Sequence, residues 1–215
     1  MRPVRLTELD RVAVLGAHCD DIAIGAGGTL LTLCAANPGI AVDALVLTGG
    51  GTGRAVEEQA ALSAFCPDAK LDLTVLDLPD GRLPTQWGQA KAAVEAFRQR
   101  SAPQVLLAPH ARDAHQDHRL LAELVPTAFR DHLVLGYEIV KWDGDAHQPT
   151  VYQPLTDEVA SRKAELLIEH YPSQHGRDWF DRETFLSVAR LRGVQCHARY
   201  AEAFHLAKMT MDFGG

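Results

Sequence analysis

Short apolar runs alternate with amphipathic stretches along the first two thirds of the chain. The apolar runs are rich in Val and Leu and have the length of buried strands, which predicts strands at 11–17, 42–48, 71–78, 105–109 and 133–140. Apolar residues recur at helical spacing between these runs, which predicts helices at 29–36, 55–65, 89–100 and 117–129. Such alternation is typical of βαβ units. We therefore predict an α/β fold with a mostly parallel sheet and helices on both faces.

The pattern loosens after Val140. Gly144, Pro149 and Pro154 interrupt it and predict an irregular excursion. Helical spacing returns at 156–169 and 182–191, and a short strand is predicted at 200–208. The chain has no internal repeat, low-complexity tract or flexible linker, so we expect residues 1–215 to form a single domain.

The charge balance narrows the classes of partner. The 21 Lys and Arg residues are outnumbered by 28 Asp and Glu residues, giving a net charge of −7. Nucleic-acid surfaces need clustered basic residues, so a nucleic-acid partner is not expected and a small neutral or cationic ligand is more natural. We expect no membrane insertion, because no run reaches the roughly 18 apolar residues of a membrane span.

Cysteine usage and the start of the chain both favour a cytoplasmic protein. Four widely spaced cysteines include no CxxC pair, which predicts reduced thiols rather than a disulfide framework. No basic segment leads into an apolar stretch with a small-residue cleavage site, so export is not expected. The oligomeric state stays open, a homo-oligomer included.

Two of the predicted strands end in clusters of metal-ligand side chains. The first strand leads into His18-Cys19-Asp20-Asp21, and the strand at 105–109 leads into His110 and then His115-Gln116-Asp117-His118. Side chains at the carboxyl ends of parallel strands converge on one crevice, so these distant clusters are expected to meet. Two His and one carboxylate are the ligands of an open zinc site in a hydrolase.

The spacing within each cluster suggests a role for each residue. His18 and Asp21 are three residues apart and can reach one ion, and His118 can complete the set. Asp20 is then free to take a proton from a metal-bound water. His115 lies near the same cavity, where it can stabilise an oxyanion and protonate a leaving amine.

Asp117 is suited to orienting His115 and raising its pKa. Two plainer interpretations stay open. Asp20 and Asp21 could be a helix-capping pair, and the second cluster could be a solvated loop rich in His and Asp.

The glycine run Gly25-Ala26-Gly27-Gly28 suggests two alternatives. A dinucleotide fold places its phosphate loop after the first strand, but here the spacing is wrong and two carboxylates would repel a pyrophosphate. Close packing of the first helix against the sheet explains the run better.

Several motifs together resemble one known family. They are His18-Cys19-Asp20-Asp21, the pair His115 and His118, Pro79-Asp80-Gly81-Arg82-Leu83, Tyr171-Pro172-Ser173-Gln174, and Arg192-Gly193 followed by Tyr200-Ala201-Glu202-Ala203-Phe204. In this order they resemble the PIG-L/LmbE-like deacetylases, and the resemblance extends from residue 12 to residue 204.

The resemblance implies a Rossmann-like three-layer sandwich with its active site at the C-terminal ends of the strands. It implies a zinc-dependent hydrolase that removes an acetyl group from an N-acetylated amino sugar; ferrous iron or another divalent ion suits the same ligands. Carried over, the metal ligands are His18, Asp21 and His118, the base is Asp20, and His115 is the acid or oxyanion partner with Asp117 behind it. Arg54 matches an arginine that contacts substrate hydroxyls. On looser grounds, Asp80 is a candidate sugar contact whose alternative is a plain turn residue.

The chain departs from the family pattern at two points. Cys19 replaces a common proline, and either ligates the metal as thiolate or fills the place of proline as a small buried residue. Ile22 and Ala23 replace the acidic residue that often follows the Asp pair. Two other functions stay open: a non-catalytic sugar-binding protein on the same fold, and an amidase acting on a non-sugar amide conjugate.

Overall fold

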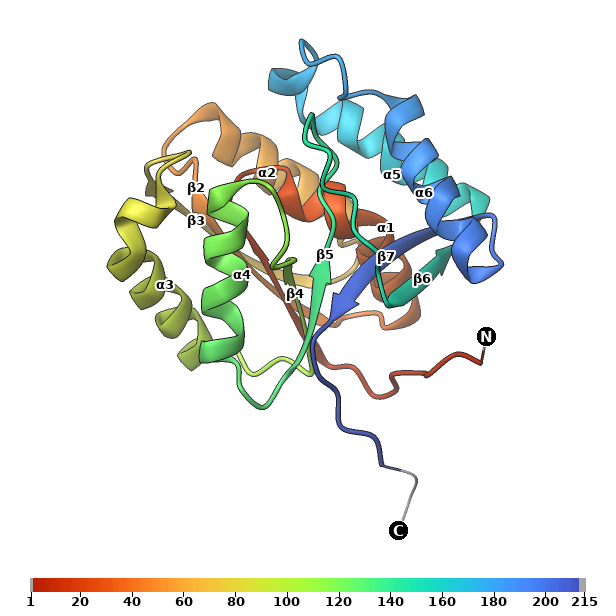
Figure 1. Cartoon of the computed structure of the whole chain (residues 1–215), viewed down its shortest axis with the longest axis horizontal. Helices are drawn as coiled ribbons and strands as arrows, with labels where there is room; N and C mark the ends of the chain where they lie inside the picture. Colours follow the sequence, from red (N-terminus) through yellow and green to blue (C-terminus); the bar gives the residue numbers. More distant parts are fainter. Residues whose placement is uncertain (1, 213–215) are drawn as a thin grey trace.

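A seven-stranded mixed sheet runs through the computed structural model, which describes residues 2–212 (Figure 1). The strands are β1 (Arg11–Gly16), β2 (Ala41–Thr48), β3 (Lys70–Leu78), β4 (Val105–Pro109), β5 (Leu133–Tyr137), β6 (Val151–Leu155) and β7 (Tyr200–Leu206). Their order is β3-β2-β1-β4-β5-β7-β6. The first five strands are parallel, and β7 runs antiparallel to both β5 and β6. The predicted mostly parallel sheet is confirmed.

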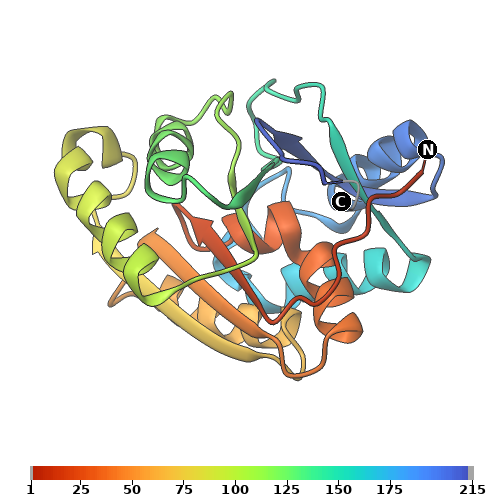
Figure 2. The same ribbon diagram turned by 90° about the horizontal axis from the view of Figure 1, so that it is seen from below.

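Helices cover both faces of the sheet, as Figures 1 and 2 show. They are α1 (Asp21–Ala36), α2 (Gly53–Phe65), α3 (Trp87–Arg100), α4 (Gln116–Ala128), α5 (Asp157–His170) and α6 (Arg182–Cys196), with short 3-10 turns at Leu83–Gln86 and Pro172–Gln174. The alternation of side chains along β1 explains this arrangement. Val12 and Val14 join the core under α1, α2 and α5, whereas Ala13 and Leu15 join the core under α3 and α4.

The strand order creates a crevice beside β1. From β1 the chain adds β2 and β3 on one side, then crosses to add β4 and β5 on the other. The loops that follow β1 and β4 therefore leave the sheet in opposite directions, and ligand sites of open α/β sheets lie at such a switch point. Both predicted ligand clusters follow these two strands.

Helix α1 begins at Asp21, earlier than the predicted start at residue 29. The glycine run lies inside this helix. Its glycines have no Cβ, and this lets the helix pack closely against neighbouring side chains. A Cβ on Gly25 would collide with the ring of Tyr137, and one on Gly27 would lie 2.6 Å from the ring of Phe65. Close packing, rather than a phosphate loop, is the role that these contacts support.

Two further boundaries differ from the prediction, and one strand was not predicted. β5 ends at Tyr137, and Ile139 leaves the sheet to line a cavity. The predicted excursion contains the edge strand β6, which the sequence hides because Pro154 interrupts its strand pattern; proline is tolerated on an edge strand. Helix α6 continues to Cys196 rather than ending at 191.

None of the helices described between residues 2 and 212 has both the length and the apolarity to cross a membrane.

Candidate metal centre and active site

The turn after β1 brings His18 and Asp21 together. Asp21 begins α1, and its Oδ2 accepts hydrogen bonds from the backbone N–H groups of Ala17 (2.9 Å) and His18 (2.8 Å). The same oxygen lies 3.5 Å from His18 Nδ1. These bonds fix a buried carboxylate whose other oxygen, Oδ1, is free to face a second partner.

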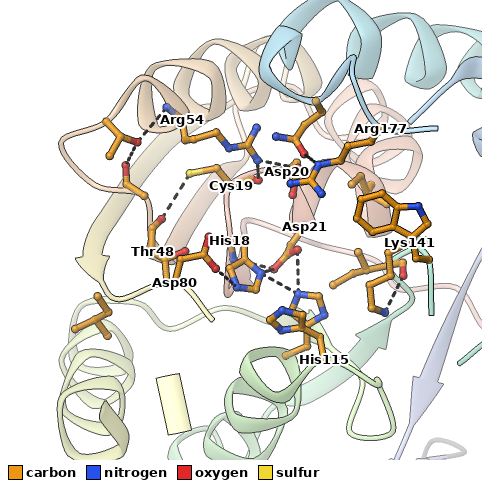
Figure 3. A pocket seen from close by; sticks show the side chains of 18 of the residues that line it. His18, Cys19, Asp20, Asp21, Thr48, Arg54, Asp80, His115, Lys141 and Arg177 are labelled. Atoms are coloured by element: carbon orange, nitrogen blue, oxygen red, sulfur yellow. Dashed lines mark hydrogen bonds and ion pairs between the residues drawn. The ribbon is translucent and has the colours of Figure 1, made fainter. Parts of the chain in front are cut away.

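That second partner is His118, in the first turn of α4. Asp21 Oδ1 lies 3.2 Å from His118 Nε2, and His118 Nε2 lies 3.0 Å from His18 Nδ1. Potential metal ligands from two distant segments therefore converge, and Figure 3 shows His18 and Asp21 side by side. Asp117 and His118 are both buried, which excludes the alternative of a solvated loop.

This arrangement fits a divalent metal. Metal–ligand bonds of about 2.0–2.2 Å place the ligands of a tetrahedral ion roughly 3.3–3.6 Å apart, close to the separations of 3.0–3.5 Å seen here. Burial alone would lower the pKa of His118, but Asp21 and Asp113 outweigh it and raise that pKa to about 9. The site therefore attracts positive charge, as a cation site should.

His18 has a second nitrogen that faces other carboxylates. Its Nε2 lies 3.1 Å from Asp117 Oδ2 and 3.2 Å from Asp80 Oδ1. When each residue contributes a single ligand atom, two groups within residues 2–212 have all such atoms within 4.8 Å of one another: His18 with His115 and His118, and His18 with Asp80 and Asp117. Asp21 meets His18 and His118 with different oxygens, Oδ2 and Oδ1. The Nδ1 side of His18 is the better candidate for a metal site, because Asp80 is 78% exposed and the Asp117 carboxylate already accepts hydrogen bonds from two backbone N–H groups.

Asp117 does not orient His115 as predicted. Its carboxylate accepts hydrogen bonds from the N–H groups of Gly81 (2.8 Å) and Leu83 (3.0 Å) and faces His18 Nε2. Only its backbone N–H reaches His115, at Nδ1 (3.3 Å). The start of the helix explains this difference: His115 is the N-cap residue of α4, and its ring accepts the hydrogen bond of the Asp117 N–H in the first helical turn.

The pKa of His115 also differs from the expectation. It is lowered, first by burial and then by the neighbouring imidazoles of His118 and His18; Asp117 raises it to a smaller extent. With Nδ1 accepting a hydrogen bond, the neutral ring carries its proton on Nε2. The ring centroid of His115 lies 4.8 Å from that of His18 and 4.7 Å from that of His118.

Asp20 lines the cavity beside Asp21. Asp20 occupies the N-cap position of α1, but its side chain makes no capping hydrogen bond, so capping does not account for this carboxylate. Arg54 Nη2 donates to Asp20 Oδ2 (2.7 Å) and also to the carbonyl oxygen of Cys19. Burial raises the pKa of Asp20, Arg54 opposes that shift and Asp21 adds to it, giving a value of about 6.

Arg54 lines the same cavity, but its guanidinium is already hydrogen-bonded to other residues of the protein. Besides Asp20 and Cys19, they are Glu57 Oε2 (2.9 Å) and Ser173 Oγ (2.7 Å). Contact of Arg54 with substrate hydroxyls stays a prediction, as does the sugar contact of Asp80, whose exposed carboxylate also lines the cavity.

Cys19 is buried beside the cluster but its thiol points elsewhere. Its Sγ lies 3.6 Å from the carbonyl oxygen of Thr48, and a Cβ on Gly49 would lie 2.8 Å from the same sulfur. Burial raises the pKa of this thiol, with Glu58 adding to the shift. A protonated, packed thiol supports the small-residue interpretation over the thiolate ligand.

Asp113 is a functional candidate that sequence reasoning missed. Its Oδ2 lies 3.0 Å from His118 Nδ1, and its Oδ1 lies 3.0 Å from Lys141 Nζ. Burial opposes ionisation, but His118 and Lys141 outweigh it and lower the pKa of Asp113 to about 2. A carboxylate behind a ligating imidazole fixes its orientation. The signal was its position in the loop between β4 and α4, five residues before His118.

The cluster opens into a cavity of about 570 Å³, a size typical of small-molecule sites. The cavity is also lined by Ile139, Trp142, Arg177 and Trp179. The indole N–H of Trp142 donates to Asp178 (2.6 Å), and the guanidinium of Arg177 lies 5.3 Å from the Trp142 ring centroid. A fixed indole at a cavity wall offers a flat apolar surface to a ligand ring.

Comparison with known proteins points to one family. The sequence model described as PIG-L, GlcNAc-PI de-N-acetylase, matches residues 13–129. A relative from Escherichia coli K12, "Uncharacterized deacetylase YaiS", is 28% identical over 172 residues, covering 74% of this chain and 89% of its own length.

Two solved structures share the fold. The N,N'-diacetylchitobiose deacetylase of Pyrococcus horikoshii has a TM-score of 0.69 at 20% identity, covering 93% of this chain and 84% of its own. GalB, the 4-carboxy-2-hydroxymuconate hydratase of Pseudomonas putida KT2440, has a TM-score of 0.70 at 16% identity, covering 96% and 100%. The fold therefore occurs in proteins with different reactions, and the site must decide the chemistry.

Proposed function

Because the chain belongs to the GlcNAc-PI de-N-acetylase (PIG-L) family, we propose that it is a zinc-dependent N-deacetylase of small N-acetylated amino sugars or their conjugates. One observation carries the proposal: His18, Asp21 and His118 converge within 3.5 Å while Asp20 and His115 line the same cavity. We propose that residues 1–215 act as one domain, with the cytoplasm as its compartment.

His18, Asp21 and His118 would hold the metal, and ferrous iron or another divalent ion suits the same ligands. When bound, such an ion acts as a Lewis acid toward water and the amide carbonyl. The buried Asp113 would keep His118 in position, and Asp117 would do the same for His18.

Asp20 and His115 supply the proton transfers. The Asp20 carboxylate faces the cavity, where it takes the proton of the attacking water. His115 carries a proton on Nε2, which it can direct to the developing oxyanion. The departing amine needs one proton, and this is the proton that Asp20 took from the water, passed on directly or through the ring of His115. The C–N bond then breaks to give acetate and a free amine.

The shape of the cavity supports a sugar or sugar conjugate. Asp80 and Arg54 offer polar groups to hydroxyls, and the Trp142 wall offers a surface for an apolar ring face or an aglycone. The relative from Pyrococcus horikoshii acts on an N-acetylated disaccharide by its name, which favours the same substrate class.

Two alternatives make different predictions. A sugar-binding protein on this fold has no need of Asp20 or of the orienting carboxylate Asp113, so their presence at the metal ligands favours an enzyme. An amidase for a non-sugar conjugate would use the same residues, and only its substrate would differ.

The test is release of free amine from a panel of N-acetylated amino sugars and non-sugar N-acyl amides by the zinc-loaded protein. We expect amine from the N-acetyl sugars, with little from the non-sugar amides. Amine released only from the non-sugar amides would favour the amidase. Binding of sugars without amine from any compound would favour the sugar-binding protein.

A further inference from the structure

Glu58 is a buried carboxylate without an assigned role. It lies in α2, is 0% exposed, and contacts the turn that carries Asp20. Its Oε2 accepts hydrogen bonds from the Asp20 backbone N–H (2.8 Å) and from the Tyr171 hydroxyl (2.7 Å). Its Oε1 has no hydrogen-bond partner among the described residues. Burying a carboxyl group away from water costs free energy, so the burial of Glu58 requires an explanation.

The residue that Glu58 contacts has an unusual backbone. Asp20 has φ 101° and ψ −25°, in the left-handed region, where a residue with a Cβ is strained. The turn occurs where the chain leaves β1 and enters α1. It lets Asp21 face His18 and His118 while Asp20, its neighbour, also faces the cavity. Such a conformation persists only where surrounding contacts hold it.

Helix α2 supplies those contacts from two successive turns. Arg54 binds the Asp20 carboxylate and the Cys19 carbonyl oxygen, and Glu58, four residues later, binds the Asp20 N–H. Residues four apart lie on the same face of a helix, so one face of α2 holds both the side chain and the backbone of Asp20.

We infer that Glu58 is a positioning residue that holds the strained Asp20 turn, so that the Asp20 carboxylate meets the reacting water in the correct place. Tyr171 fixes Glu58 in turn through its hydroxyl. The role requires a hydrogen-bond acceptor rather than a charge: burial raises the pKa of Glu58 to about 8, so the neutral acid is an accessible form, and its Oε2 can still accept.

This inference rests on the proposed function for its kinetic test, but one measurement is independent of activity. Glu58→Gln keeps an acceptor oxygen, and Glu58→Met keeps a similar volume without one. Tyr171→Phe removes only the hydroxyl. Asp43→Leu is the control, because it also removes a buried carboxylate. Asp43 lies on β2, outside the cavity, and its carboxylate is bonded to Arg11 and Ser101.

We expect Glu58→Met to lower kcat on an N-acetyl amino sugar about 10²-fold, since small misplacements of a catalytic group cost this much. KM and bound zinc should change less than about threefold. Glu58→Gln should stay within about fivefold of wild type, and Tyr171→Phe should fall between the two. Asp43→Leu should lower the unfolding free energy while kcat changes less than about threefold.

The independent measurement is hydrogen exchange of the Asp20 amide, followed by NMR in the metal-free protein. We expect protection in the wild type and in Glu58→Gln, and its loss in Glu58→Met. Wild-type kcat in a folded Glu58→Met protein would overturn the inference, as would a Glu58→Gln as slow as Glu58→Met. If Glu58→Met does not fold, unchanged kcat and Asp20 exchange in Tyr171→Phe would overturn it. If no N-acetyl compound is hydrolysed, the proposed function fails, and the exchange data still decide the role of Glu58.

Discussion

The described residues include two clusters of three histidines, which differ in the charged groups around them. In the first, His18, His115 and His118 have ring centroids 4.7–5.0 Å apart. In the second, His110 stacks on His205 at 4.5 Å and meets the edge of His147 at 5.5 Å. Residue type and spacing are therefore similar in both.

Carboxylates distinguish the two clusters. Asp21 and Asp113 flank His118 and raise its pKa to about 9 against the effect of burial. Burial lowers the pKa of both His110 and His205 to about 4. At His110 the charges of Asp113 and Asp145 oppose this shift without cancelling it, and His147 adds to it; at His205 the neighbouring imidazoles add to it. Among residues 2–212, donors converge within 4.8 Å only in groups that include His18. We therefore propose the first cluster as the cation site, because carboxylates contact its histidines directly.

Removing a proposed metal ligand should have the largest effect on activity, and it tests the difference between the two histidine clusters most directly. His118→Ala should lose both zinc and activity, the latter by at least about 10³-fold, because metal and Lewis-acid chemistry leave together. His110→Ala is the matched control from the second cluster and should keep the zinc content of the wild type. Elemental analysis of both variants measures this; full zinc in His118→Ala would contradict the ligand assignment.

Within the first cluster, the two adjacent aspartates should separate. Asp20→Asn should keep zinc and lower turnover about 10²–10⁴-fold, the usual contribution of general acid–base catalysis. Asp21→Asn should instead lower zinc affinity, because its carboxylate contacts both ligating histidines. Zinc analysis beside single-turnover rates checks this, and the reverse pattern would exchange the two roles.

His115 should behave as a histidine of the cluster that does not hold the metal. We expect His115→Ala to lower turnover about 10²-fold, the usual loss when one oxyanion donor is removed, with zinc content unchanged. Rates and metal content measured on the same preparation test this. Loss of zinc in parallel with activity would show that His115 is a ligand.

The second cluster should affect stability rather than activity. The folded pKa of His110 is about 4, below the ordinary value of 6.5, so the unfolded chain binds more protons between these values. Its contribution to the unfolding free energy is fully present above about pH 6.5 and is lost as the pH falls toward about 4.

In His110→Gln, the unfolding free energy should therefore fall by about 1–2 kcal/mol less than in the wild type as the pH is lowered. This is less than the full pKa shift implies, because water reaches part of the cluster. Urea denaturation of the metal-free wild type and variant at several pH values between 4 and 7 measures the difference. Parallel curves for the two proteins would contradict this account of the second cluster.

The sequence predicted the parallel sheet and the meeting of the two ligand clusters, because both follow from periodicity and from the geometry of strand ends. It could not predict which carboxylate faces which imidazole. Asp117 was expected to serve His115, yet the Gly81 and Leu83 N–H groups draw its carboxylate toward His18.

The early start of α1 and the strand β6 were missed for a related reason. Gly25 is tolerated in the helix because Tyr137 packs against it, and Pro154 is tolerated because β6 is an edge strand. Glu58 carries no motif at all, since its role appears only when α2 packs beneath the Asp20 turn. Local patterns cannot encode such tertiary contacts.

Anomalous X-ray scattering at the zinc absorption edge, from crystals of the zinc-loaded protein, tests the central claim most directly. The account predicts one strong peak bounded by His18 Nδ1, His118 Nε2 and the Asp21 carboxylate, and no peak among His110, His147 and His205. A peak on the other side of His18, between Asp80 and Asp117, or at the second histidine cluster, would contradict it.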